Sequence, residues 1–131
     1  MLISDGRCFV CGRDNARGLQ LEFSYAPDGL SAETTFVPGE TYQGWQGIVH
    51  GGIIITVLDE VMAKAAVHKG YAVVTGEITA KLKNPAKVLE PLRCRAVIEK
   101  VLRKIIYASA VASREDGTVV AEATAKLVII P

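Results

Sequence analysis

The chain has 131 residues, the size of one ordinary domain, and half of them are hydrophobic. This is enough for a hydrophobic core that needs no disulfide or metal to stabilise it. A formal net charge of +1 gives no global attraction to nucleic acid or to an anionic membrane, so we expect neither as a partner. Three cysteines do not make a disulfide framework. The N-terminal stretch is too polar for a signal peptide, and no apolar run is as long as a membrane span. Together with the odd number of cysteines, these features favour a reduced, cytoplasmic setting.

The first third of the chain predicts a lead-in followed by a hairpin. Residues 1–18 are mixed in character and rich in Gly, Cys and Arg, which predicts a loop-like lead-in. Residues 19–25 alternate between apolar and polar side chains, and residues 30–36 do so again. Pro27-Asp28-Gly29 between them is a turn signal, so the two runs predict a β-hairpin.

From residue 51 the period changes to that of a helix. Apolar side chains recur at spacings of three and four residues: Ile54, Leu58, Val61, Met62 and Ala65. The other sides are also largely apolar, so we expect this helix to be buried on most faces. Basic residues followed by Gly70 predict its end near His68.

The remainder predicts strands over residues 72–82, 92–103, 105–113 and 119–130, with a strong hairpin turn at Asp116-Gly117. The order is two strands, one helix, then further strands. The sequence therefore predicts an α+β fold, a single domain over residues 1–131 in which an antiparallel sheet wraps one buried helix.

Residues 47–60 read GIVHGGIIITVLDE, so a histidine and a glycine pair precede an apolar helix that contains two carboxylates. Burying a carboxylate without partners is costly, which favours a functional role for Asp59 over a structural one. Glu60 lies about 100° around the helix from Asp59, and we expect it to face solvent or a subunit contact. The glycine pair also has a simpler interpretation, a tight turn that His50 caps or braces.

This segment, the preceding Gln43-Gly44-Trp45-Gln46 and the order of strands resemble the hotdog-fold acyl-CoA thioesterases, most closely the phenylacetate-pathway (PaaI-like) group. The most specific part is His-Gly-Gly with an aspartate nine residues after the histidine. The opening Cys8-Phe9-Val10-Cys11-Gly12 also resembles bacterial members. The resemblance covers nearly the whole chain. It implies a hotdog fold, hydrolysis of an acyl-CoA to a free acid and coenzyme A, and no metal or redox cofactor.

The resemblance also implies catalytic roles for individual residues. Gly51 matches the position whose backbone N–H polarises the thioester carbonyl, with His50 beside it, and Asp59 matches the catalytic carboxylate. Thr75 falls where relatives carry a Ser or Thr that helps to hold the water, although an ordinary strand threonine is an equal alternative. The chemistry suits these roles, because N–H groups at a helix start can receive the negative charge that develops on the carbonyl. Asp59 could act as general base or as nucleophile, and the sequence leaves both open.

Other residues are predicted to contact the substrate: Gly52, Gln43, Gln46, Glu60, Met62 and Lys83. Some relatives have an asparagine where this chain has Gly44, so Gln43 or Gln46 would supply any side-chain contribution to the oxyanion hole. Met62 suggests an apolar pocket for the acyl group, and Lys83 is one of several basic residues that could meet the phosphates of coenzyme A.

Spacing along the helix predicts an oligomer. Gly51 and Asp59 are eight residues apart, which is about 12 Å along one helix. A reacting carbonyl cannot lie about 3 Å from both. If both residues serve one site, they come from two chains, as in the family's sites, so we expect a homodimer or a homotetramer built as a dimer of dimers.

The N-terminal cysteines predict no metal site. Cys8-x-x-Cys11 could be half of a zinc knuckle, but zinc usually takes four ligands and the chain has no second pair. We therefore expect two loop cysteines without a metal.

Two other functions fit the same pattern. One is a non-catalytic acyl-CoA sensor, which the presence of Asp59 and Thr75 disfavours. The other is a hotdog hydratase or dehydratase with His50 as its base, although His-Gly-Gly followed by an aspartate is more typical of the hydrolases.

Overall fold

The structure is a computed structural model that describes residues 2–131. Its elements in chain order are β1 (Ser24–Tyr25), β2 (Ser31–Phe36), the 3₁₀ turn η1 (Glu40–Tyr42), α1 (Gly51–His68), β3 (Val73–Leu82), β4 (Leu92–Leu102), β5 (Ile105–Arg114) and β6 (Val119–Ile129).

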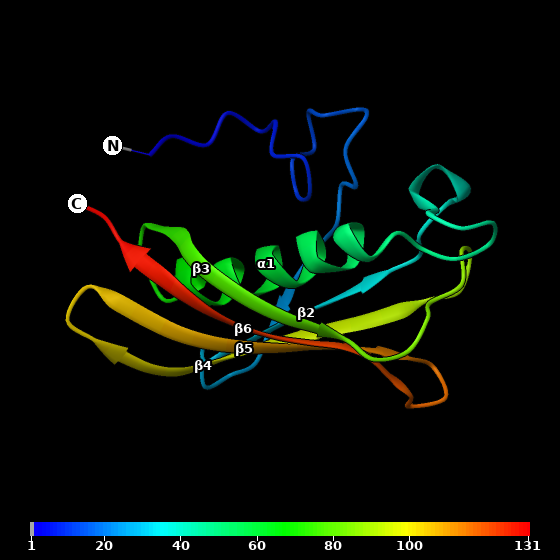
Figure 1. The fold of residues 1–131 in the computed structure, drawn as a ribbon. Helices are drawn as coiled ribbons and strands as arrows, with labels where there is room; N and C mark the ends of the chain where they lie inside the picture. The colour runs from blue at the N-terminus through cyan, green and yellow to red at the C-terminus, as the bar shows by residue number, and fades with distance from the viewer. Residues whose placement is uncertain (1) are drawn as a thin grey trace.

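The strands form one antiparallel sheet in the order β1-β2-β4-β5-β6-β3, and the sheet curves around α1, which lies against one face of it (Figure 1). This is the predicted α+β layout, and the predicted helix agrees with the structure at both ends. Strand β3 is an edge strand, so one side of its backbone has no neighbouring strand among residues 2–131. The pairing of β3 with β6 is irregular between Thr75 and Glu77, at Gly76.

The core lies between the helix and the concave face of the sheet. From the helix come Val57, Leu58, Val61 and Met62, which are fully buried. The strands contribute inward-facing residues of alternating period: Leu92, Cys94, Ala96, Ile106, Ala121, Ala123, Ala125 and Leu127. Many of these are alanines, and small side chains let the sheet approach the helix closely.

The predicted first strand is much shorter than expected. Only Ser24–Tyr25 pairs with β2, whereas residues 19–23 run beside the N-terminal segment. The Leu19 and Leu21 amides donate to the carbonyls of Phe9 and Val10, at 2.8 and 2.9 Å. Between them Gln20 has a φ of 51°, a left-handed conformation that interrupts an extended strand. The alternation still gave the correct inward side, because Leu19 and Leu21 pack against the core.

Residues 2–18, called here the N-terminal segment, contain neither helix nor strand. The segment lies on the side of α1 that faces away from the sheet (Figure 1, blue). Helix α1 is thus covered by the sheet on one side and partly covered by the N-terminal segment on the other, close to the expectation of a helix buried on most faces.

Candidate active site

The start of α1 is built around His50. This residue is the N-cap, and its Nδ1 accepts a hydrogen bond from the Gly52 N–H at 3.0 Å, so Nδ1 carries no proton in this arrangement. The Ile53 N–H donates to the His50 carbonyl at 3.0 Å. The interpretation of His50 as a capping residue, left open by the sequence, agrees with this geometry.

The backbone N–H of Gly51 has no hydrogen-bond acceptor within residues 2–131, although both following amides of the helix have one. It is therefore a free donor at the positive end of the helix dipole. A Cβ added at Gly51 would lie 2.5 Å from Cδ1 of Leu82, which is half-exposed. The Leu82 side chain thus reaches the helix start, and a larger residue at position 51 would have to displace its end. The sequence pointed to Gly51 but gave no sign of Leu82.

An open cavity of about 410 Å³ lies at this helix start. Its lining includes His50, Gly51 and Trp45, whose side chain is 86% exposed. The loop that carries Trp45 is held by a hydrogen bond from the Gly47 N–H to Oε1 of Gln43, at 3.0 Å. Gln43 thus supports the loop, and Gln46 is an exposed residue of the same loop.

Asp59 and Thr75 lie together. The Thr75 hydroxyl donates to Oδ1 of Asp59 at 2.6 Å, between helix α1 and edge strand β3. A short bond from a hydroxyl to a carboxylate is one of the stronger kinds of hydrogen bond. Thr75 immediately precedes the irregularity at Gly76, and such bulges often re-aim side chains next to active sites. The structure therefore brings two predicted site residues into direct contact.

Gly51 and Asp59 belong to the same unbroken helix, so the distance argument made from the sequence applies to the structure. The structure does not bring these two residues together within one chain. Asp59 does lie beside β3, at the edge of the sheet, where a second molecule can approach.

Comparison with known families matches the profile described as the thioesterase superfamily to residues 46–121, a range that contains Gly51, Asp59 and Thr75. The chain belongs to the thioesterase superfamily.

The chain is also similar to individual proteins of the superfamily. The acyl-coenzyme A thioesterase THEM4 of Xenopus laevis is 33% identical over 95 residues, which cover 69% of this chain and 41% of that protein. The chain spans 41% to 50% of the length of the curated relatives that it matches.

Solved structures of the superfamily confirm the hotdog fold. A thioesterase superfamily protein superposes with a TM-score of 0.87 at 26% identity, covering 95% of this chain and 61% of that chain. A phenylacetic acid degradation-related protein from Ralstonia eutropha superposes with a TM-score of 0.77 at 25% identity, covering 85% and 86%. The resemblance to PaaI-like thioesterases is thereby confirmed.

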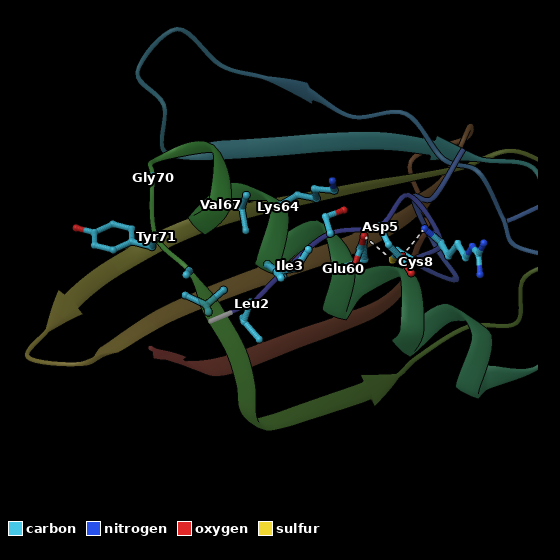
Figure 2. A pocket seen from close by; sticks show the side chains of 14 residues that line it. Leu2, Ile3, Asp5, Cys8, Glu60, Lys64, Val67, Gly70 and Tyr71 are labelled. Carbon is cyan, nitrogen blue, oxygen red and sulfur yellow. Dashed lines mark hydrogen bonds between the residues drawn. The ribbon is translucent and has the colours of Figure 1, made fainter. Parts of the chain in front are cut away.

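Glu60, which we expected to face solvent or a subunit contact, instead lies half-buried against the N-terminal segment of its own chain. The Cys8 thiol donates to Oε2 of Glu60 at 3.4 Å. Burial, a hydrogen bond with Glu60 and another with Cys8 raise the pKa of the Cys11 thiol to about 12. Beside this group is a larger open cavity of about 840 Å³, between the N-terminal segment, α1 and the start of β3 (Figure 2).

The remaining predicted substrate contacts are Met62, Lys83 and Gly52. Met62 is fully buried in the core between helix and sheet. Lys83 follows β3 and forms an ion pair with Glu122 at 3.0 Å. Gly52 is exposed at the helix start, where its N–H is taken by His50. Among residues 2–131, no helix is both long and apolar enough to cross a membrane.

Proposed function

We propose that the chain is a thioesterase that hydrolyses an acyl-CoA thioester to a free acid and coenzyme A. The observation that carries the proposal is the Thr75–Asp59 hydrogen bond, because it holds a carboxylate at the edge of the fold. The acyl-CoA substrate class is supported by the name of the 33% identical relative, an acyl-coenzyme A thioesterase.

In this proposal the Gly51 N–H, which has no acceptor within residues 2–131, donates to the thioester oxygen as negative charge develops on it. The cavity at the helix start leaves room for the carbonyl beside Gly51. His50 holds the helix start through its Nδ1, which occupies the Gly52 N–H and leaves the Gly51 N–H as the donor for the thioester oxygen. His50 is thus a positioning residue here.

Asp59 supplies the other half of the chemistry, as general base toward water or as nucleophile toward the carbonyl. Its Oδ1 accepts the Thr75 hydroxyl, so the second oxygen is the one available for the reaction. In the general-base route Thr75 orients the carboxylate and helps to place the water.

We propose further that each site combines Gly51 of one chain with Asp59 of its partner in a homodimer. The separation of about 12 Å along α1 supports this arrangement. So does the position of Asp59 next to β3, an edge strand of ten residues whose free backbone groups can pair with those of a second copy.

The test is hydrolysis of acyl-CoA thioesters by wild type and by Asp59→Asn, measured on short-, medium- and long-chain and aryl substrates. An amide is neither a base nor a good nucleophile, so we expect Asp59→Asn to lose most of the activity while the fold is kept. Asp28→Asn, at an exposed turn, is the matched control and should match wild type. Activity of Asp59→Asn within a few-fold of wild type would contradict the assignment. Wild type that binds coenzyme A thioesters without cleaving any of them would indicate the sensor function instead.

A further inference from the structure

Three potential metal ligands meet on a side of α1 that differs from the one where Asp59 contacts β3. Cys8 and Cys11 come from the N-terminal segment, and Glu60 comes from the middle of the helix. Their ligating atoms all lie within 4.8 Å of one another. Figure 2 shows Cys8 reaching Glu60 across the gap between the segment and the helix.

We propose that Cys8, Cys11 and Glu60 bind one Zn²⁺ ion, with water as the fourth ligand. In a tetrahedral zinc site, bonds of about 2.3 Å to sulfur and about 2.1 Å to oxygen put the sulfur and oxygen ligands about 3.6 Å apart. The separation between Cys8 Sγ and Glu60 Oε2 is 3.4 Å, close to this value. Three protein ligands and one water are a common zinc arrangement.

Backbone N–H groups stabilise the loop between Cys8 and Cys11 and contact the Cys8 sulfur. The Val10 N–H donates to Cys8 Sγ at 3.4 Å, which stabilises negative charge on that sulfur. The Gly12 N–H donates to the Cys8 carbonyl at 2.9 Å and closes the turn. A Cβ at Gly12 would lie 2.5 Å from both the Cys8 nitrogen and the Gly6 oxygen, so this tight turn needs a glycine.

Charge and space around the three ligands also suit the ion. Two thiolates and one carboxylate around Zn²⁺ leave a net charge of about −1, and Lys64, one helical turn after Glu60, brings a positive charge to the same cavity. Cys8 and Glu60 line the cavity of about 840 Å³, which leaves room for a water ligand. Binding would release the two thiol protons to solvent. The ion would tie the N-terminal segment to α1 at the residue next to Asp59.

The proposal departs from the expectation of two loop cysteines without a metal. That expectation rested on the missing second pair of ligands. The structure supplies Glu60, 52 residues from Cys8 in the sequence, as a third ligand.

The test uses the untagged full chain, reduced with a non-thiol reductant and freed of metal with a chelator. Titration with Co²⁺ should reach one ion per chain and give the absorption bands of thiolate ligation and tetrahedral geometry, and one equivalent of Zn²⁺ should displace it. Cys8→Ser and Cys11→Ser should lose thiolate-band intensity. Glu60→Gln should keep these bands but bind at least about tenfold more weakly, as expected for loss of a ligand.

Two controls match the ligands in type. Cys94→Ala removes the buried cysteine of β4, and Glu122→Gln removes a carboxylate on the sheet. Both should bind Co²⁺ as wild type does, and circular dichroism should show every variant folded. No uptake by wild type whose three thiols are shown to be reduced would overturn the proposal. So would unchanged affinity in Glu60→Gln. Because the readout is metal binding, these results do not depend on the proposed hydrolase activity.

Discussion

The composite site predicts that two inactive variants restore activity when they are mixed. One variant is Asp59→Asn, and the other is Gly51→Pro, which removes the proposed oxyanion donor. Proline suits the first position of a helix, and the preceding His50 has φ −60° and ψ 129°, a conformation favoured before proline. The added ring would meet the Leu82 side chain, so we would place Leu82→Ala in all chains of this experiment and use Leu82→Ala alone as the reference.

The expected size of the effect follows from the geometry. Loss of one oxyanion donor typically lowers kcat by about 10²- to 10³-fold, so each variant alone should be nearly inactive. A mixed dimer holds one site with both defects and one site with neither. At random assortment half of the dimers are mixed, and each has one intact site of two. The mixture should therefore recover about a quarter of the reference activity.

The assay needs proof that chains exchange. Differently tagged chains, co-purified through one tag, would show mixed dimers, and circular dichroism would show that the proline variant keeps its helix. Activity that stays at the level of the separate variants, with exchange demonstrated, would refute the shared site. Gly51 and Asp59 would then not act on the same carbonyl.

Three further predictions test individual residues. Thr75→Val keeps the shape but removes the donor to Asp59, so kcat should fall about tenfold or more, whereas Thr79→Val on the exposed face of β3 should be neutral. Met62→Ala should lower the free energy of unfolding by about 2–5 kcal/mol in denaturant titrations, because Met62 is fully buried; a changed substrate preference with unchanged stability would contradict its place in the core. Burial raises the pKa of Cys94 from 9.0 to about 12, which lowers its thiolate fraction at pH 8 roughly a thousandfold. An alkylating reagent should therefore leave Cys94 unmodified in the native protein at pH 8, and its reaction should accelerate as the pH rises toward 12.

The sequence predicted the helix and the last four strands well, because their periodicity reflects burial directly. Ile54, Leu58 and Val61 recur at helical spacing, and the same residues are buried against the sheet. Helix α1 begins at Gly51, where the His-Gly-Gly motif placed it. In β6 the alternation from Ala121 onward gave the inward side correctly.

The sequence pattern could not predict contacts between residues far apart in the chain. The first hairpin was overestimated because alternation in residues 19–23 also arises when a chain packs against the core without a strand partner. The Thr75–Asp59 bond required knowledge that β3 passes beside the middle of the helix. Without the position of the N-terminal segment, Glu60 could only be assigned to an outward face.

Asp59 and Glu60 are adjacent in α1 but contact different parts of the fold. A step of about 100° turns Asp59 toward β3 and the sheet edge and Glu60 toward the N-terminal segment. A change at Glu60 therefore acts first on the segment and leaves the Thr75 contact in place, whereas a change at Asp59 acts on the edge of the sheet. If Zn²⁺ joins Cys8 to Glu60 as proposed, its loss would release the N-terminal segment from α1 at the residue next to Asp59. The Thr75–Asp59 hydrogen bond lies outside this contact, so we expect loss of the ion to leave it in place.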